Sequence, residues 1–321
     1  MKAVVCRAYG LAGLAIEEVE KPAAGEGEVL LQVRAAALNA LDWHFLRGTP
    51  ASARIFLGLR RPRTTRPGRD LAGVVEAVGE KVTRFAPGDR VFGACRGAFA
   101  EFACAQERAL SLLPANLTFE QGAAAPIAGS TALQGLRDAG RLRPGQRVLV
   151  HGAGGGVGTF AVQIARLLGA GEVTAVTRPA NLEAVRDLGA DHVLDSSRED
   201  FTASGRRYDL ILDCHFDRAL SRCRRALAPE GRYVLAGGPV TSLSGLLAGA
   251  LARLAHSALG RRAFVSFIAR LRPDDLALLG EWMAAGKLAP VIDRREGLGA
   301  VPAALGDLAA GRARGKLVLA V

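Results

Sequence analysis

The sequence predicts an α/β protein in which a β-rich domain accompanies a doubly wound parallel sheet with helices on both faces. Three observations lead to this prediction. Residues 1 to about 120 hold short runs rich in valine and other apolar residues, separated by turn sequences. From about residue 121, segments typical of strands and of helices alternate, which indicates a parallel sheet. A glycine-rich stretch joins one of these strands to the helix that follows it.

The β-rich part begins with residues 1–6, MKAVVC, which are typical of a strand and not of a signal peptide. Further strands are expected over 28–38, 72–79 and 90–95. The sequences AAGEGE and APGDR, which lie between them, supply the residues that turns favour.

The alternating part contains apolar runs separated by amphipathic segments. The expected strands cover 147–152, 172–177, 191–195, 208–214 and 231–238. The expected helices cover 157–169, 181–189 and 217–228. The C-terminal part adds helices over 274–286 and 299–311 and a final strand over 315–321.

The charge pattern limits the classes of function. The formal net charge is +11, from 42 basic and 31 acidic residues, and nearly all the basic residues are arginine. The arginines are scattered apart from clusters at Arg60–Arg63 and Arg222–Arg225, and only three tyrosines and two tryptophans are present to stack on bases. This pattern argues against a nucleic-acid partner and favours a modest attraction for anionic cofactors.

Cysteine usage and hydropathy indicate the compartment. The five cysteines are odd in number and none has the C-x-x-C spacing of a zinc or redox motif, so we expect a reducing, cytoplasmic location. The most apolar run, residues 243–260, contains Arg253 and His256 and is too short and too charged to span a bilayer. We therefore expect no membrane association, and a buried or subunit-facing position for this run.

The glycine-rich stretch lies within VLVHGAGGGVGTFAVQIARLLGA, residues 148–170, between a strand and a helix. This is the context that a dinucleotide fingerprint requires. Gly152 would let the chain turn, Gly154–Gly156 would let the backbone approach a pyrophosphate, and Gly158 would let the helix pack closely on the sheet. The alternative is a tight turn without a ligand. The residues expected to bind the cofactor here are Gly152, Ala153, Gly154, Gly155, Gly156, Val157 and Gly158.

The end of the next strand indicates which dinucleotide binds. An NAD site usually has a carboxylate there for the ribose 2′-hydroxyl, whereas this strand ends in Thr177 and Arg178. Arg178 would pair with a 2′-phosphate, so the sequence predicts NADP(H). The alternative is that Arg178 is a solvated loop residue.

Several ordered motifs then resemble one family. NALDWHFLRG at 39–48, PGRDLAGVVEAVG at 67–79, FAPGDRVFG at 85–93 and AAAPIAGSTALQGL at 123–136 precede the glycine loop in that family's order, although Ala40 stands where proline is usual. The chain resembles the zinc-free, quinone oxidoreductase-like branch of the medium-chain dehydrogenase/reductase superfamily, and is similar to bacterial relatives of the reticulon-interacting oxidoreductase.

The resemblance implies a GroES-like catalytic domain made of residues 1–120 with 265–321, and a Rossmann NADP(H)-binding domain of residues 121–264. It also implies an active site in the cleft between them, and a homodimer. Zinc enzymes of the superfamily have Cys and His at the positions of Asn39 and Arg69, and neither residue is a plausible zinc ligand, so no metal is expected. Without a Lewis acid, the expected reaction is hydride delivery to an electron-poor quinone or α,β-unsaturated carbonyl.

The catalytic candidates are Asn39, His44 and Arg69. By resemblance, Asn39 lies near the nicotinamide and substrate, or else stabilises a turn. His44 either bonds or protonates a developing enolate oxygen, or is a packed or surface histidine. Arg69 either polarises a carbonyl or binds an acidic substrate group, or pairs with Asp70. Asp42 is expected to have a structural role, bonding nearby backbone.

The family also implies contacts of Thr131, Gly237 and Gly238 with the nicotinamide, and of Asn181 with the 2′-phosphate region. One segment departs from the family, because Cys214-His215-Phe216-Asp217 replaces a loop of small residues. Its bulk would alter the space for the nicotinamide ribose.

Three functions fit the sequence. The first is an NADPH-dependent reductase of a small quinone or enone. The second is an enoyl-thioester or biosynthetic tailoring reductase, whose phosphate contacts the cluster Arg60–Arg63 would supply. The third is a nucleotide-binding protein that binds RNA or a partner and has little turnover.

Overall fold

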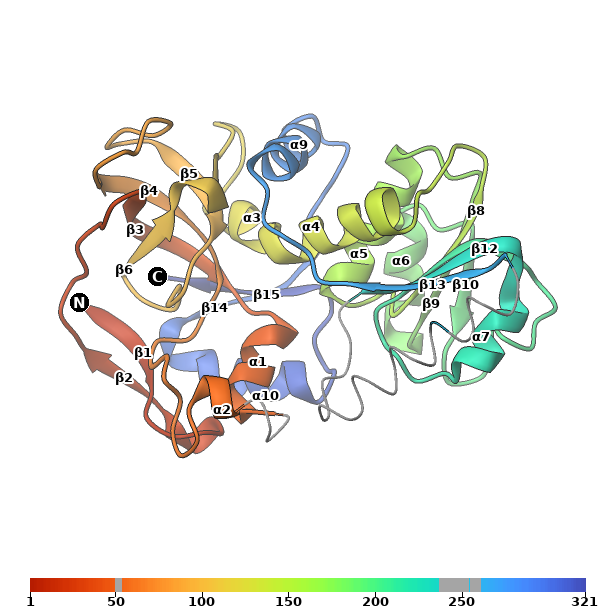
Figure 1. Ribbon diagram of the computed structural model, residues 1–321, viewed down its shortest axis with the longest axis horizontal. Helices are drawn as coiled ribbons and strands as arrows, with labels where there is room; N and C mark the ends of the chain where they lie inside the picture. The colour runs from red at the N-terminus through yellow and green to blue at the C-terminus, as the bar shows by residue number, and fades with distance from the viewer. Residues whose placement is uncertain (50–53, 237–253, 255–260) are drawn as a thin grey trace. The chain divides into compact units, whose positions relative to one another are not determined.

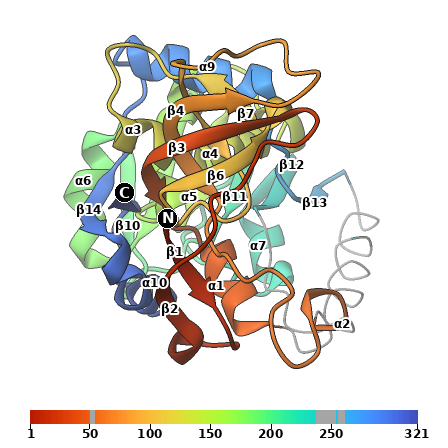
Figure 2. The ribbon, with the colours of Figure 1, turned by 90° about the vertical axis from the view of Figure 1, so that its left-hand side faces the viewer.

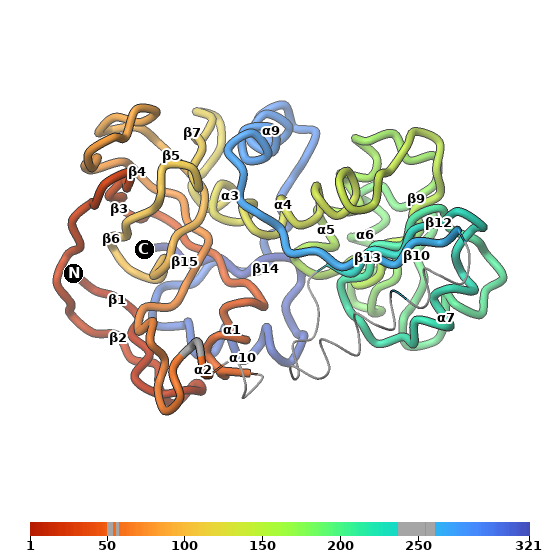
Figure 3. Tube along the Cα trace, in the orientation of Figure 1, coloured from red at the N-terminus to blue at the C-terminus, as the bar shows by residue number. Residues whose placement is uncertain are grey.

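The computed structural model describes residues 1–49, 54–236, 254 and 261–321, which form two compact units. Unit 1 contains Met1–Ser130 and Leu271–Val321, and unit 2 contains Thr131–Arg270. Figure 1 labels the elements of both, and both termini can be followed within unit 1 in Figure 3. Both boundaries lie later in the chain than those expected after residues 120 and 264.

Unit 1 is built on a seven-stranded sheet to which both ends of the chain contribute. Six strands follow the order β14-β15-β3-β4-β5-β7, and β6 pairs with β3 outside this order. Figure 2 shows β3, β4 and β6 at the front of this unit. The strands are β3 (Glu28–Ala37), β4 (Asp70–Val78), β5 (Arg90–Ala94), β6 (Phe102–Gln106), β7 (Leu110–Leu112), β14 (Ile292–Gly297) and β15 (Lys316–Ala320).

The C-terminal strand β15 pairs in parallel with β14 and antiparallel with β3. The core therefore combines Val4, Leu31 and Leu71 with Leu305 and Leu317 from the other end of the chain. A separate two-stranded sheet joins β1 (Lys2–Cys6) to β2 (Leu14–Glu18). The helices of this unit are α1 (Ala40–Arg47), α2 (Arg54–Leu57), α3 (Phe119–Ala124), α9 (Pro273–Ala284) and α10 (Val301–Ala309), and the unit boundary falls within α4 (Pro126–Gln134).

Unit 2 is a six-stranded sheet with the order β10-β9-β8-β11-β12-β13, in which every pairing is parallel. In chain order this is 3-2-1-4-5-6, the arrangement of a doubly wound dinucleotide-binding sheet. The strands are β8 (Arg147–His151), β9 (Glu172–Thr177), β10 (His192–Asp195), β11 (Tyr208–Asp213), β12 (Leu227–Ala236) and β13 (Ala263–Phe267). The helices are α5 (Gly156–Leu167), α6 (Leu182–Asp187) and α7 (Leu220–Ala226).

The expected α/β fold with a doubly wound parallel sheet is confirmed, with two differences in its elements. The helix expected over 217–228 ends at Ala226, and β12 starts at Leu227, before the strand expected at 231. Pro229 explains this end, because a helix disfavours the residues just before a proline. The strands β2, β6, β7, β13 and β14 and the helices α1–α4 were not among the expected elements.

Some expectations lie outside the described residues. These are Gly237 and Gly238, and the apolar run over 243–260 except for Leu254. In the part of the chain that the structure describes, no helix is long and apolar enough to cross a membrane.

Candidate active site

Two loops meet where the strand order of unit 2 reverses, between β8 and β11. One is the glycine turn after β8, and the other is the segment 214–217 after β11. A Cβ atom built on Gly152 would lie 3.4 Å from the Cβ of His215, so the two loops are in contact. In open α/β sheets, ligands bind outside the carboxyl ends of the strands at this reversal.

Three glycines of the turn are required by the fold itself. Gly152 has a φ of 82°, in the left-handed region that favours glycine. A Cβ on Gly158 would overlap the backbone carbonyl oxygen of Gly152, and this glycine therefore allows α5 to pack against the turn. A Cβ on Gly154 would overlap the side chains of Thr177 and Asn181.

Gly155 is different, because neither backbone nor packing requires a glycine there. Its φ is −86° and its ψ is 176°, which any residue adopts. Within 4 Å, an added Cβ would meet only the carbonyl oxygen of Gly152, at 3.4 Å. The space beside Gly155, directly before the first turn of α5, is open to a ligand. Helix N–H groups of that turn have no acceptor within the helix, so the residues present fit a pyrophosphate.

The residues expected near the adenosine end come together on one side of the glycine turn. Thr177 and Asn181 are buried, and both side chains lie against Gly154. Arg178 is exposed between them in the sequence, at the end of β9. Among the described residues, no carboxylate lies within ion-pair distance of Arg178, so its guanidinium is available to an anion.

A buried carboxylate holds the segment after β11. Asp213 is fully buried and accepts hydrogen bonds from Nδ1 of His151 at 3.0 Å, from the hydroxyl of Tyr233 at 2.6 Å, and from the backbone N–H groups of His215 and Phe216 at 2.9 Å. Burial acts to raise the pKa of Asp213, but the bonds from His151 and Tyr233 outweigh it and hold the pKa below its ordinary value. The carboxylate therefore joins β8, β11 and β12 beside the glycine turn.

The segment 214–217 itself has an unusual backbone. Phe216 has a φ of 65°, which is rare for a residue with a side chain. The two N–H groups that Asp213 accepts fix this conformation. The segment 214–217, which is bulkier than the loop of small residues typical of the family, therefore forms an ordered turn beside Gly152.

In unit 1, Asn39 belongs to a buried polar network. Its Oδ1 accepts a hydrogen bond from Nζ of Lys316 at 2.7 Å, and its Nδ2 donates to Oδ2 of Asp70 at 3.0 Å. Lys316 lies at the start of β15 and Asp70 at the start of β4, and Asn39 lies two residues after the end of β3, the strand between them. Asn39 was expected near the substrate or in a turn; it is the N-cap residue of α1, and its amide is bonded to Lys316 and Asp70.

Asp42 bonds nearby backbone, as expected, because its Oδ2 accepts the N–H of Asn39 at 2.8 Å. Burial raises the pKa of Asp42 and the neighbouring Asp70 adds to the rise, while the bond from Asn39 and the charges of Lys316 and Arg69 oppose it, and the resulting pKa is about 7. The carboxyl therefore changes its charge near neutral pH.

Arg69 does not pair with Asp70 in the described part of the chain. The Asp70 carboxylate is bonded instead to Asn39, to Lys316 and to the backbone N–H of Ile127. The guanidinium of Arg69 lies 5.0 Å from the ring centre of Phe45, and its charge lowers the pKa of Asp42. Its other two expected roles, toward a substrate carbonyl or acid, stay predictions.

His44 is exposed in the last turn of α1. Although the residue as a whole is exposed, partial burial of its imidazole ring lowers the pKa of His44, and the positive charge of Arg47 lowers that pKa further. The imidazole is therefore biased toward its neutral form. Thr131 is half-buried in α4, and its expected contact with the nicotinamide stays a prediction.

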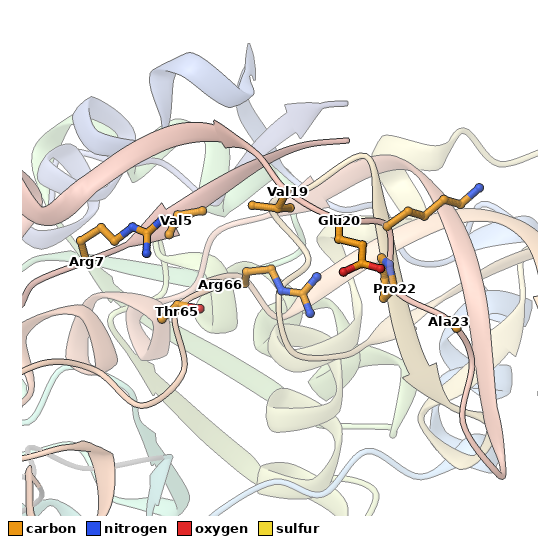
Figure 4. Close-up of a pocket in the computed structure, with 9 residues that line it drawn as sticks. Val5, Arg7, Val19, Glu20, Pro22, Ala23, Thr65 and Arg66 are labelled. Atoms are coloured by element: carbon orange, nitrogen blue, oxygen red, sulfur yellow. The ribbon is translucent and has the colours of Figure 1, made fainter.

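Two hollows formed by described residues lie away from these site residues. One, of about 570 Å³, lies in unit 1 between Arg7, Lys21 and Arg66 (Figure 4). A second, of about 460 Å³, shares Arg7 and also contains Arg61 and Arg63. Among the described residues, no group of three or more His, Cys, Asp and Glu side chains could hold a metal ion.

Sequence reasoning missed two parts of this arrangement. The first part is the burial of Lys316. The sequence GKLVLAV was expected to form a strand, but it gives no sign that the ammonium group of its lysine is buried. The bond between His151 and Asp213 was also missed. The signal available was that both residues end apolar strands, whose carboxyl ends meet in a parallel sheet.

Comparison with known proteins supports both units. Residues 25–115 match the family model described as alcohol dehydrogenase GroES-like domain, and residues 188–319 match the model described as zinc-binding dehydrogenase. The solved structure of a quinone oxidoreductase from Coxiella burnetii superimposes with a TM-score of 0.89 at 27% identity, covering 100% of this chain and 99% of that one.

Three curated relatives span most of this chain. A chloroplastic quinone-oxidoreductase of Triphysaria versicolor is 33% identical over 99% of this chain and 98% of its own length. A chloroplastic NADPH-dependent alkenal/one oxidoreductase of Arabidopsis thaliana is 32% identical over 91% of this chain and 72% of its own. A spectinabilin polyketide synthase system protein of Streptomyces orinoci is 38% identical over 91% of this chain, which spans only 13% of that protein.

These likenesses extend over both units and include relatives of the same length. Their shared architecture is a GroES-like unit together with a Rossmann-like parallel sheet, and this family of oxidoreductases binds a nicotinamide cofactor. The chain belongs to the medium-chain dehydrogenase/reductase superfamily of oxidoreductases, and within it is similar to the quinone oxidoreductases.

Proposed function

We propose that this protein transfers hydride from NADPH to a quinone or to an α,β-unsaturated carbonyl without a catalytic metal. The observation that carries the proposal is the glycine turn of unit 2: Gly155 meets only the carbonyl oxygen of Gly152, and Gly154 lies against Thr177, the residue before Arg178, which has no ion-pair partner among the described residues. Similarity to quinone and alkenal/one oxidoreductases supports the acceptor class.

In this proposal, different residues bind different parts of the cofactor. The first turn of α5 receives the pyrophosphate on its backbone N–H groups. Arg178 pairs with the 2′-phosphate, where the carboxylate of an NAD enzyme would repel it. Thr177 and Asn181, which lie against Gly154, flank that phosphate. The bound nicotinamide supplies the hydride, and the chain supplies position and charge.

Asn39 and Arg69 occupy the places of zinc ligands in the metal-dependent members of the superfamily. An amide and a cation bind carbonyl oxygens by hydrogen bonds, which suits an acceptor that is already electron-poor. In this proposal Asn39, His44 and Arg69 face the substrate, and Thr131 faces the nicotinamide. The expected homodimer and cytoplasmic location accompany the proposal as predictions.

The test is anaerobic oxidation of NADPH, followed by its absorbance, with an ortho-quinone, an alkyl vinyl ketone and crotonyl thioester as acceptors. Arg178→Asp is expected to raise KM for NADPH by about tenfold to hundredfold, because a charge-assisted hydrogen bond contributes about 1.5–3 kcal/mol. Its KM for NADH should not rise. Arg186→Asp makes the same charge change on an exposed arginine of α6 and should leave both values unchanged. An NADPH/NADH preference that Arg178→Asp does not alter would contradict the cofactor assignment.

A second candidate function is the reduction of an enoyl thioester. Similarity to the polyketide synthase protein favours it. The two hollows of unit 1 favour it too, because Arg61, Arg63 and Arg66 have no carboxylate within ion-pair distance among the described residues and would suit the phosphate of a thioester carrier. Turnover of crotonyl thioester alone would select this candidate. NADPH binding without turnover of any acceptor would contradict both and favour the binding role.

A further inference from the structure

We propose that Lys316 is a positioning residue that, together with Asp70, locks the amide of Asn39 so that this side chain can act on a ligand only as a hydrogen-bond donor. The inference rests on the proposed function, in which Asn39 faces the nicotinamide or the substrate. It specifies the polarity of that contact, and therefore the kind of atom that Asn39 recognises.

Lys316 has three acceptors for the three N–H bonds of its ammonium group. They are the backbone carbonyl oxygen of Leu38 at 3.0 Å, Oδ1 of Asn39 at 2.7 Å and Oδ2 of Asp70 at 3.3 Å. Lys316 is 2% exposed and Asp70 is fully buried. No water is needed to satisfy the ammonium, and the buried charges neutralise each other.

The lysine decides which way the Asn39 amide points. The oxygen and nitrogen of an amide have nearly the same shape, but an ammonium group can only donate, so the atom that faces it must be Oδ1. Nδ2 then faces the Asp70 carboxylate, which can only accept. A flipped amide would place a donor against a donor and an oxygen against a carboxylate, so both partners oppose the flip.

The hydrogen-bonding capacity of Asn39 is then nearly used up. Its Oδ1 is bonded to Lys316, one N–H of Nδ2 is bonded to Asp70, and its backbone N–H is bonded to Asp42. No acceptor for the second N–H of Nδ2 is found among the described residues. Asn39 is 8% exposed, so the side chain is not fully enclosed. What it offers to a ligand is one N–H donor.

A lone donor of this kind suits an oxygen that gains negative charge. When hydride adds to an enone or a quinone, the carbonyl oxygen becomes an enolate or a phenolate, and a fixed donor stabilises that charge without reorganising. The carboxamide oxygen of the nicotinamide is a second acceptor of the same chemistry. A ligand group that can only donate finds no partner on Asn39.

The sheet register keeps the three residues in place. Ala37 pairs with Asp70 across β3 and β4, and with Val318 across β3 and β15. The backbone N–H of Leu38 donates to the carbonyl oxygen of Leu317 at 3.0 Å. The lysine therefore reaches Asn39 from a strand at the other end of the chain, and it does so only when β15 is paired.

The test compares the pair variant Lys316→Met/Asp70→Asn with Asn39→Ala. Removing Lys316 alone would leave a buried unpaired carboxylate and would cost folding, whereas removing both charges avoids this penalty. We expect the pair variant to fold, to keep its NADPH affinity within about twofold, and to lose about a hundredfold in kcat, the typical effect of losing one donor to a developing oxyanion. Lys287→Met removes an exposed lysine of unit 1 and should have no effect.

Combining the pair variant with Asn39→Ala distinguishes a positioning role of Lys316 from a purely structural one. If Lys316 acts through Asn39, adding Asn39→Ala to the pair variant costs little more, whereas independent effects multiply. If the loss of kcat in the combined variant equals the product of the two separate losses, the inference is overturned. If Asn39→Ala alone leaves kcat intact, it is the proposed role of Asn39 that fails. A neutron structure of the pair variant, in which the amide hydrogens are visible, decides independently of activity, because an Asn39 amide that keeps its orientation there would overturn the lock.

Discussion

At the scale of single residues, Asp42 shows how burial changes the chemistry of a side chain that the sequence marks only as part of a motif. It is 3% exposed, and its single strong partner is the N–H of Asn39. Two carboxyl groups, Asp42 and Asp70, then lie close to one ammonium group, Lys316. Burial is the main cause of the raised pKa of Asp42 and the neighbouring Asp70 adds to it, while Lys316, which is bonded directly to Asp70 and not to Asp42, offsets only part of the rise.

This imbalance predicts a pH-dependent stability. The pKa of Asp42 is about 7 in the folded protein and about 4 when unfolded, so the folded state binds the proton more tightly. The contribution is complete below pH 4 and is lost as the pH rises toward 7, with a slope of up to about 1.4 kcal/mol per pH unit. Asp42→Asn removes this loss. Urea unfolding should show that the free energy of unfolding of Asp42→Asn increases relative to that of the wild type between pH 4 and 7. Above pH 7 the difference between the two should be constant.

The control for this measurement is Asp187→Asn, which changes an exposed aspartate of α6. Its difference from the wild type should have no such slope between pH 4 and 7. A pH-independent difference for Asp42→Asn would show that the carboxyl stays ionised throughout and that the pKa is not raised.

How far the sequence predicted the site depends on sequence distance. Asn39 and Asp42 lie in one short motif, and the bonding of Asp42 to local backbone was predicted correctly. Lys316 was not predicted, because it is 277 residues from Asn39 in the chain and its own neighbours are those of an ordinary strand. Only the pairing of β15 with β3 brings the two together. Arg69 shows the opposite error, since its sequence neighbour Asp70 is bonded elsewhere.

At the scale of elements, the connection from β8 to α5 separates what the fold needs from what a ligand needs. Gly158 is required by contact with the carbonyl oxygen of Gly152, whereas Gly155 faces open space. The sequence pattern predicted close helix packing for Gly158 and approach to the pyrophosphate for Gly154–Gly156, but it did not separate Gly155 from Gly154, which lies against Thr177 and Asn181. The structure assigns them different reasons, and this difference can be tested.

Gly158→Ala and Gly155→Ala should therefore fail in different ways. Gly158→Ala forces α5 away from the turn and should lower the free energy of unfolding by about 1–3 kcal/mol or more, as overpacking does. Gly155→Ala should change stability by no more than about 0.5 kcal/mol, since its φ and ψ suit alanine. It should nevertheless weaken NADPH binding, because the methyl group occupies the ligand's space.

Thermal unfolding and quenching of protein fluorescence by NADPH measure the two effects separately. Each variant serves as the other's control. If Gly155→Ala binds NADPH as tightly as the wild type, the pyrophosphate does not lie at this turn.

Most strands of unit 2 were predictable because each contains an apolar run, and helices follow β8, β9 and β11. Some elements of both units were not predicted. The exceptions have physical causes. The strand β14, IDRREG, carries four charged residues and is a strand only because it pairs with β15 at the edge of its sheet. The start of β12 was taken as the end of a helix, because LAPE continues the pattern of the preceding arginine-rich segment until Pro229.

At the scale of the whole molecule, unit 1 depends on a strand, β15, that is far in sequence from the strand β3 with which it pairs. β15 lies inside its sheet, between β14 and β3, and not at an edge. Leu317, Val318 and Leu319 are at most 3% exposed. The same strand carries Lys316, so the completion of the sheet and the orientation of Asn39 are one event. Unit 2, whose strands all lie between residues 131 and 270, has no such dependence.

A chain that stops after Gly315 should therefore lose unit 1 and keep unit 2. Burying each of the three large side chains of β15 contributes about 1.5–3 kcal/mol, so together they are worth about as much as the whole stability of a typical domain, about 5–15 kcal/mol. Limited proteolysis followed by mass spectrometry should show cleavage throughout 1–130 and 271–315, with a protected fragment near 131–270. A chain that stops after Ala320 lacks only Val321 and should resist proteolysis like the wild type. Protection of unit 1 in the shorter chain would mean that β14 and β3 close the sheet without β15, and the lock on Asn39 would then need another source.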